Sequence, residues 1–560
     1  MLRSRLRRSA LAVAMLAVAV MTATTATASA QPTAVPLAPA PTVLRTWSAP
    51  AIATVATPRV SRLSGSDRYA TSVAASRAAF ATGTHPPVVY LVSGTSPWQA
   101  LSATPAAVHQ GGGVLMSRPD GIPAVVAAEL TRLAPASIVL VGPASDMSAT
   151  VLDQAKRYAP DVRRIGATNR YTTAHALVRH SFAKGSGGQG WLATGQNWVD
   201  GIAAGTAAAS HRAPLLTIDG RASALPSATI TLIRTLKLTS MTIVGGPTSV
   251  SSGIQAQLTT LLGAGKVTRA AGADRYATAS RVNQLARPAL TAGPAYVASG
   301  RDFVNALAGS FLAGRTKRPL FYSQPFCVPG SVRPTLRSAA VTKVVLLGGE
   351  GSIRSLVGTL EPCRSIDAPS STWVLVNKKN QLSPKTYVPA HLVTPAVTYP
   401  NGQRLRSDAA AAVARMFAAA KAEGAGRMSI TSGYRSYSTQ SYLYSRRVST
   451  NGRAYADKWV ARPGFSEHQS GLTLDVAAVG ASRCSTFTCF GSTPQGAWLR
   501  KNAWRFGFVL RYEKGYTPVT GYSSEPWHIR FVGTPLSGAY HRGGWHTLEQ
   551  FLAEPAAPTY

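Results

Sequence analysis

Short apolar runs and alanine-rich stretches alternate along residues 60–362. The runs at residues 88–92 and 344–347 have the length and composition of buried parallel strands. The alanine-rich stretches at residues 203–210 and 306–314 favour helices. Strands that alternate with helices and end in glycine predict an α/β sheet with helices on both faces. The glycine-rich ends do not read GxGxxG, so we expect no dinucleotide site there.

The hydrophobic pattern changes after a polar connector at residues 364–372, which marks a domain boundary. A helix is predicted from Ser407, as its N-cap, to Gly424, which ends it. A strand at residues 429–431 and a helix over residues 438–447 follow. These elements open a further domain.

Two strands of this last domain carry polar side chains among apolar ones. In GLTLDV, Thr473 and Asp475 alternate with apolar neighbours, so Asp475 lies on the face opposite to them. A carboxylate flanked by apolar residues needs a strong partner such as a cation, because an unpaired buried charge is costly. The run HIRFV alternates in the same way, which puts His528 and Arg530 on one face. Strands give ligands the rigidity that a metal site needs.

Three motifs recur upstream of this domain, roughly every 100 residues. The first reads RLSGSDRYAT from Arg62, RIGATNRYTT from Arg164 and RAAGADRYAT from Arg269. The second reads SGTSPWQAL from Ser93, TGQNWVDGI from Thr194 and SGRDFVNAL from Ser299. The third reads VLVGPAS from Val139, IVGGPTS from Ile243 and LLGGEGS from Leu346. Their common order and period predict three copies of one structural unit.

The net charge is strongly positive, since 58 lysines and arginines against 22 acidic residues give +36. Such an excess favours a polyanionic partner: nucleic acid, anionic lipid or an anionic polymer of a bacterial wall. The charge describes the surface as a whole and does not single out residues.

The N-terminus has the pattern of a secretory signal peptide over residues 1–30. Arginines between positions 3 and 8 precede an apolar run at residues 10–20 and the small residues Ala28-Ser29-Ala30. A flexible leader rich in alanine, proline and threonine follows at residues 31–59. No later run has the roughly 20 apolar residues of a membrane span. We therefore expect a secreted protein without a membrane span, and no nucleic-acid partner.

Four cysteines suit the oxidising compartment that export implies. They allow three pairings, and the domain order favours disulfides Cys327–Cys363 and Cys484–Cys489. Zinc binding by these cysteines is the alternative, but their spacing contains no CxxC pair. We expect structural disulfides.

The candidate chemistry lies in GFSEHQSGLTLDV, which starts at Gly464, and in EPWH, which starts at Glu525. Two histidines, one carboxylate ligand and one spare glutamate are the parts of a hydrolytic zinc site. Catalytic zinc takes three protein ligands and leaves a position for water, and His468, Asp475 and His528 would be those ligands. Glu525 would accept a proton from the water and return it to the leaving amine.

Two further side chains suit substrate binding. Arg435 can bind a substrate carboxylate in a bidentate fork, which lysine could not reproduce. Ser466 can hydrogen-bond the substrate backbone. The alternative is that His468 and His528 are ordinary hydrogen-bonded histidines, which either residue alone would favour. The joint pattern S-x-H-x(6)-D with E-x-x-H argues for the metal site.

The repeats resemble the cell-wall-binding repeat 2 family over residues 60–362, on the R-x-x-G-x-[DN]-R-Y-x-T and VGG motifs. The resemblance implies a three-lobed assembly that holds surface proteins non-covalently on anionic cell-wall polymers. The second copy has Ala167 in place of glycine, and the first has Gln99 where the others carry Asp200 and Asn305. The repeated Arg-Tyr pairs either bind anions or tie a loop to the sheet, and we favour the structural role.

Residues 373–534 resemble a VanY-type D-alanyl-D-alanine carboxypeptidase. The resemblance rests on SGYRS from Ser432, ARPGFSEHQSGLTLDV from Ala461, GFVLRY from Gly507 and GYSSEPWHIRFVG from Gly521. It implies the compact fold of LAS-type peptidoglycan peptidases, a small antiparallel sheet with helices. It also implies zinc on His468, Asp475 and His528, Glu525 as the base, and substrate roles for Arg435, Ser466 and Gln440. Thr473 stands where the family often has alanine, and the Cys484–Cys489 stretch is an insertion.

The expected fold is therefore three Rossmann-like α/β repeats, at residues 60–160, 161–265 and 266–363, and an α+β LAS-type zinc peptidase domain at residues 373–552. The expected function is a wall-anchored carboxypeptidase that removes the terminal D-Ala from peptidoglycan stem peptides. An endopeptidase that cuts stem peptides or cross-links is the alternative within this fold. An inactive wall-anchored binding protein is the alternative from another class, although the intact ligand set argues against it.

Overall fold

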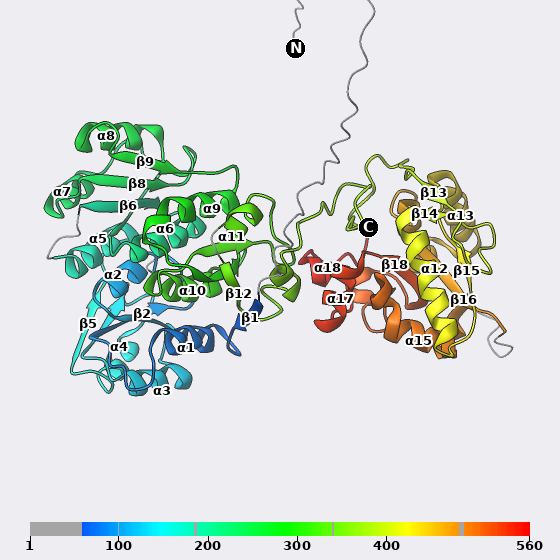
Figure 1. Cartoon of the computed structure of the whole chain (residues 1–560), viewed down its shortest axis with the longest axis horizontal. Coiled ribbons are helices and arrows are strands. Elements are labelled where there is room, and N and C mark those ends of the chain that lie inside the picture. Colours follow the sequence, from blue (N-terminus) through cyan, green and yellow to red (C-terminus); the bar gives the residue numbers. More distant parts are fainter. Residues whose placement is uncertain (1–58, 99, 184–187, 339–340, 481–486) are drawn as a thin grey trace, which may run out of the picture. The chain divides into compact units, whose positions relative to one another are not determined.

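The computed structural model describes residues 59–560 apart from residue 99 and residues 184–187, 339–340 and 481–486 (Figure 1). The expected signal peptide, the leader up to residue 58, Gln99 and Cys484 lie outside the described residues. The predicted disulfide Cys327–Cys363 is confirmed. Among the described residues, no helix has both the length and the apolar character that crossing a membrane requires.

Three parallel four-stranded sheets form the repeat region. The first has the order β3-β2-β4-β5, with β2 (Val88–Ser93), β3 (Gly113–Ser117), β4 (Ser137–Val141) and β5 (Asp161–Ile165). The second has the order β7-β6-β8-β9, with β6 (Gln189–Thr194), β7 (Leu215–Ile218), β8 (Ser240–Val244) and β9 (Val267–Ala270). The third has the order β1-β12-β10-β11, with β1 (Arg59–Leu63), β10 (Gly293–Ser299), β11 (Leu320–Ser323) and β12 (Val341–Leu347).

Helices alternate with these strands, as the sequence predicts. The first unit contains α1 (Arg68–Ala79), α2 (Ala103–His109), α3 (Ala124–Leu133) and α4 (Ala149–Ala155). The second contains α5 (Arg170–Ser181), α6 (Trp198–Ser210), α7 (Ser227–Thr235) and α8 (Ser252–Leu262). The third contains α9 (Arg275–Ala286), η1 (Arg287–Ala289), α10 (Phe303–Arg315), α11 (Arg333–Ser338) and η2 (Ser355–Thr359). The predicted α/β repeats are therefore confirmed.

The first two sheets each take an edge strand from the following repeat of the sequence. β5 opens the second repeat but pairs with β4, and β9 opens the third repeat but pairs with β8. β1 opens the first repeat and pairs with β12 at the far end of the repeat region, with Arg62 opposite Leu346. Figure 1 shows the blue β1 beside the green β12. The strand that begins the repeat region thus completes its last sheet.

The Arg-Tyr pairs of the first motif clamp, that is contact from two sides, the glycine of the second motif. A guanidinium donates to the glycine carbonyl in each unit, from Arg68 to Gly94 at 2.6 Å, from Arg170 to Gly195 at 2.9 Å and from Arg275 to Gly300 at 2.8 Å. The adjacent tyrosine covers the same glycine: a Cβ on Gly94 would lie 2.7 Å from the ring of Tyr69. A side chain does not fit beneath the ring, so the motifs need glycine at this position. These contacts give the pairs a structural role.

The alanine-rich helices of the three units pack on one another. Thr206 of α6 donates to Ser310 of α10 at 2.9 Å, and a Cβ on Gly314 would lie 2.6 Å from the Cβ of Ala209. Small side chains allow this close approach, since the distance between packed helices depends on the residues at the contact.

The last domain contains a four-stranded antiparallel sheet of order β15-β16-β18-β17. Its strands are β15 (Met428–Ser432), β16 (Thr473–Ala478), β17 (Phe508–Tyr512) and β18 (Glu525–Phe531), and β13 (Leu392–Val393) pairs with β14 (Leu405–Arg406). Its helices are α12 (Ser407–Ala422), α13 (Tyr437–Asn451), α14 (Arg453–Trp459), η3 (Glu467–Ser470), η4 (Phe487–Ser492), α15 (Pro494–Asn502), η5 (Ala503–Phe506), α16 (Thr517–Thr520), α17 (Thr534–Arg542) and α18 (Leu548–Leu552). The expected α+β fold is confirmed.

The predicted helix after residue 406 is α12, with one difference at its start. Ser407 is its first residue, and the N-cap is Arg406, whose side chain makes no capping hydrogen bond. Asp408 in the first turn accepts from the Arg406 guanidinium at 2.8 Å and from the amide of Ala409. A carboxylate in the first turn therefore stabilises the helix start in place of a capping serine.

Candidate active site

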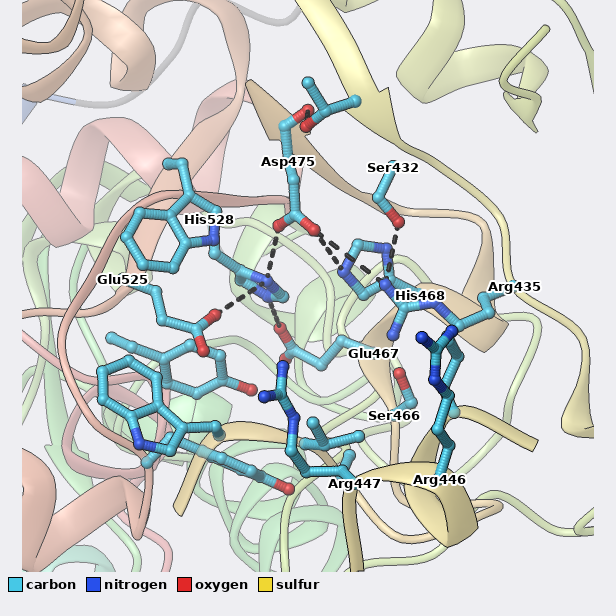
Figure 2. A pocket seen from close by; sticks show the side chains of 18 of the residues that line it. Ser432, Arg435, Arg446, Arg447, Ser466, Glu467, His468, Asp475, Glu525 and His528 are labelled. Carbon is cyan, nitrogen blue, oxygen red and sulfur yellow. Dashed lines mark hydrogen bonds and ion pairs between the residues drawn. The ribbon is translucent and has the colours of Figure 1, made fainter. Parts of the chain in front are cut away.

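A cavity of about 960 Å³ opens in the last domain (Figure 2). Its walls include residues of η3, β16, β18, α13 and α14. Every residue that the sequence predicts for the site lines this cavity except Gln440: His468, Asp475, His528, Glu525, Arg435 and Ser466.

The three predicted metal ligands face one another. Asp475 lies opposite His528 in the pairing of β16 with β18, and His468 comes from η3 just before β16. The nearer oxygens of Asp475 lie 3.3 Å from Nε2 of His468 and 3.2 Å from Nδ1 of His528. One ligand atom from each residue can be chosen so that all lie within 4.8 Å of one another.

The second nitrogen of each histidine is held by the protein. Nδ1 of His468 donates to the carbonyl oxygen of Gly433 at 2.8 Å, which leaves Nε2 toward Asp475. Nε2 of His528 donates to Glu467 at 3.3 Å, which leaves Nδ1 toward Asp475. Such partners fix the tautomer and the ring orientation of a metal-ligating histidine.

This donor set fits zinc. Two imidazole nitrogens and a carboxylate oxygen are a usual catalytic ligand set, and tetrahedral ligands at about 2.0–2.2 Å from zinc lie roughly 3.4 Å from one another. The separations of 3.2 Å and 3.3 Å to Asp475 agree with that spacing. His468 and His528 are each 4% exposed, so the nitrogens are fixed by a buried environment.

Glu467, which the sequence did not single out, is a fully buried part of the site. Its carboxylate accepts from Arg511 at 2.9 Å and from Arg530 at 3.0 Å, and it faces His528. Burial opposes ionisation, but Arg511 and Arg530 outweigh it and hold the pKa of Glu467 well below its usual range. Arg530 was the sequence feature that could have pointed to such a residue, because it shares a strand face with His528 and needs a buried carboxylate partner.

His528 bridges the carboxylates of Asp475 and Glu467. Burial alone would lower its pKa, but the hydrogen bonds to Asp475 and Glu467 outweigh burial and raise the pKa of His528 to about 9. Burial and the nearby Arg435 charge lower the pKa of His468. The pKa values of the two histidines are thus shifted in opposite directions, up for His528 and down for His468.

Glu525 shares the cavity with the ligands. Its carboxylate lies 3.6 Å from Nδ1 of His528, and burial raises its pKa to about 8. Strand alternation alone would put residues 525 and 528 on opposite faces. The register between β17 and β18 shifts between Leu510 and Tyr512, opposite this segment, and that irregularity lets both side chains reach the cavity.

Gln440 holds Arg435 and does not reach the cavity. Gln440 is fully buried, accepts from Arg435 at 2.8 Å and donates to the carbonyl oxygen of Ala461 at 2.6 Å. Arg435 also donates to Ser432 at 2.8 Å and lies 4.0 Å from Asp475. The guanidinium is therefore fixed beside the ligands, and Ser466, 3% exposed, lines the cavity near it.

Two families match separate parts of the chain. Residues 402–534 match VanY: D-alanyl-D-alanine carboxypeptidase. Residues 62–152, 164–255 and 269–357 match cell wall binding domain 2.

Individual proteins match over parts of their length. YodJ of Bacillus subtilis (strain 168) is 41% identical over 177 residues, which cover 30% of this chain and 63% of YodJ. The bifunctional D-Ala-D-Ala dipeptidase and D-Ala-D-Ala carboxypeptidase VanXYC of Enterococcus gallinarum is 33% identical over 183 residues, which cover 32% of this chain and 93% of that enzyme. The structure of Cwp6 from Clostridium difficile has a TM-score of 0.50 at 22% identity, covers 57% of this chain and 51% of Cwp6, and supports the fold alone. The chain thus spans less than two thirds of YodJ and about half of Cwp6.

The VanY match contains His468, Asp475, His528 and Glu525, so the family assignment and the geometry of the cavity agree. The chain therefore belongs to the VanY family of D-alanyl-D-alanine carboxypeptidases, and three cell wall binding domain 2 units precede its peptidase domain.

Proposed function

We propose that this protein is a secreted, zinc-dependent D-alanyl-D-alanine carboxypeptidase that acts on peptidoglycan stem peptides. The observation that carries the proposal is the convergence of His468, Asp475 and His528 within 4.8 Å, with Glu525 beside them in one cavity. Nε2 of His468, an oxygen of Asp475 and Nδ1 of His528 would hold the zinc. When bound, zinc supplies a Lewis acid that polarises the scissile carbonyl and acidifies water.

Glu525 is the group that moves protons in this proposal. Burial raises the pKa of Glu525 to about 8, which makes its carboxylate a stronger base toward water, and the carboxyl so formed can then donate the proton to the leaving amine. The carboxylate of Glu525 lies 3.6 Å from Nδ1 of His528, so it stands beside the three residues that would hold the zinc.

Arg435 and Ser466 bind and orient the substrate. Arg435 is held by Ser432 and Gln440, so its charge stays beside the ligands without the entropy cost of ordering a free side chain. It offers a positive charge to the terminal carboxylate of the substrate. Ser466 lines the same cavity and can hydrogen-bond the substrate backbone.

The three repeats would hold the enzyme non-covalently on anionic cell-wall polymers. A net charge of +36 favours a polyanionic partner, and the signal-peptide pattern of residues 1–30 favours export to the wall. The arginines of the repeated Arg-Tyr pairs donate to backbone carbonyls, so polymer binding would fall to other basic residues.

Defined muropeptides test the catalytic proposal. We expect the purified protein to release D-Ala from pentapeptide stems, a chelator to stop the release and added zinc to restore it. Internal cleavage would indicate an endopeptidase. Absence of hydrolysis and of stoichiometric zinc would contradict both activities and leave a wall-anchored binding protein.

Isolated walls test the anchoring proposal. We expect the full-length protein to sediment with walls and to elute with salt, because exposed ionic contacts weaken as ionic strength rises. Unchanged binding after the anionic polymers are stripped would contradict it.

A further inference from the structure

The stripe of α13 that faces the cavity is polar and positively charged. Leu443, Arg446, Arg447, Thr450 and Asn451 all line the cavity. They follow the i, i+3, i+4, i+7, i+8 spacing by which a helix usually presents an apolar face to a core. Here that face carries two arginines, a threonine and an asparagine, which indicates a surface that meets solvent or a polar ligand.

The two arginines have no carboxylate partner among the described residues. Both are exposed, and neither guanidinium has a carboxylate oxygen within 4.0 Å in the described part of the chain. Arg447 donates a long hydrogen bond of 3.4 Å to Asn451 and lies 5.9 Å from the ring of Tyr455. Figure 2 shows Arg446 and Arg447 extending toward the metal ligands.

The acidic groups of the cavity are already engaged. Asp475 and Glu525 belong to the metal site, and Glu467 is paired with Arg511 and Arg530. The positive charge of Arg446 and Arg447 is therefore available to a ligand.

The stripe is long enough to contact more than the terminal dipeptide of a substrate. From Leu443 to Asn451, α13 rises about 12 Å, at about 1.5 Å per residue. An extended peptide covers that length with three to four residues, at about 3.3–3.6 Å each. Arg435, 4.0 Å from Asp475, is the arginine nearest the ligands that can take the terminal carboxylate. The pair on α13 would then meet a different anionic group, on a residue upstream of the scissile bond.

We propose that Arg446 and Arg447 form a carboxylate-binding subsite that selects stem peptides with a free side-chain or α-carboxylate upstream of the scissile bond over their amidated forms. The proposal rests on the proposed carboxypeptidase function and names the substrate class of the same cavity. A guanidinium binds a carboxylate more strongly than a neutral amide, because both partners are charged and the hydrogen bonds can be bidentate.

The test compares two pentapeptides that end in D-Ala-D-Ala. One has γ-linked glutamate and diaminopimelate with free carboxylates, and the other has both carboxylates amidated. For the unaltered protein we expect KM to be about tenfold lower for the free-carboxylate peptide, the scale of one charge-assisted hydrogen bond, with similar kcat. The double variant Arg446→Glu/Arg447→Glu should lose that preference through KM, because the subsite binds substrate and transition state alike.

Arg453→Glu is the matched control, since Arg453 is exposed at the start of α14 and does not line the cavity. It changes the net charge by the same amount as each substitution of the double variant does. It should keep the preference for the free-carboxylate peptide. Equal KM values for the two peptides in the unaltered protein, or the same loss of preference in Arg453→Glu, would overturn the subsite.

Peptide binding to the Glu525→Ala protein separates the subsite from the activity. Calorimetry should show the same preference for free carboxylates without turnover. If the unaltered protein releases D-Ala from neither peptide, the proposed function fails. The comparison of peptide binding to Glu525→Ala still decides whether the subsite exists.

Discussion

Glu467 lies 3.3 Å from Nε2 of His528, on the opposite side of the imidazole ring from Asp475. The same carboxylate is fixed by Arg511 and Arg530, and Arg511 is in turn bound by Glu549. A buried ionic network therefore orients one metal ligand of the candidate site. The sequence neighbour of His468 thus acts on the other histidine.

Replacing Glu467 by glutamine should weaken zinc binding. The variant Glu467→Gln keeps the shape of the side chain but removes the charge that orients Nδ1 of His528 toward the metal. Loss of a partner of a metal-ligating histidine costs roughly 10- to 100-fold in metal affinity. Competition with a chromophoric chelator measures that affinity directly.

Glu549→Gln is the control for this prediction. Glu549 is fully buried and shares Arg511, but it makes no hydrogen bond to His528 among the contacts of the described residues. Both variants break a buried ion pair, which costs about 3–5 kcal/mol in the free energy of unfolding. If Glu549→Gln weakens zinc binding as much as Glu467→Gln does, Glu467 acts through stability alone.

Zinc binding near neutral pH should release about one proton from His528. Because the pKa of metal-free His528 is raised to about 9, its imidazole holds a proton at pH 7 that must leave before Nδ1 can bind metal. His468 is neutral there, because its pKa is lowered, and contributes none. Apparent zinc affinity should therefore rise with pH through neutrality and level off above about pH 9.

Calorimetry in two buffers of different ionisation enthalpy counts this proton. The Glu525→Gln variant should be used, since the raised pKa of Glu525 makes it a second source of protons. Binding without proton release in that variant would contradict the assignment to His528.

Removing the carboxyl of Glu525 should slow turnover strongly while zinc stays bound. Proton transfer by a positioned side chain contributes about 10²–10⁴-fold to a rate. Glu525→Ala should therefore lower kcat by that range, and its zinc content by elemental analysis should match that of the unaltered protein. A variant that retains activity, or that loses zinc in proportion to activity, would count against Glu525 as the base.

The sequence could single out the candidate ligands because their chemistry is local. Asp475 and His528 stand in alternating strands, and the spacing of His468, Asp475 and Glu525 is visible within two short motifs. Glu467 was missed because its partners, Arg511 and Arg530, come next to it only through the register of the folded sheet.

The strand pairing that joins the two ends of the repeat region could not be predicted from the sequence either. The repeats show that each unit opens on the same arginine motif, but the motif does not say which sheet that segment joins. The pairing of β1 with β12 depends on contacts between residues far apart in the chain. The role of Gln440 is similar, since its family position suggested substrate, while its burial behind Arg435 is visible only in the fold.

A methyl group on the clamped glycine of a repeat should destabilise that unit. In Gly300→Ala the new Cβ would lie 2.6 Å from the ring of Tyr276, so the tyrosine or the turn must move. Overpacking of this kind costs about 1–3 kcal/mol in the free energy of unfolding. Gly349→Ala is the matched control, because its Cβ would meet no atom within 4 Å. Denaturant unfolding should show a lower free energy of unfolding in Gly300→Ala alone. Below the unfolding transition, both variants should bind isolated walls equally. A loss of wall binding by folded Gly300→Ala would instead place the Arg-Tyr clamp in the polymer-binding surface.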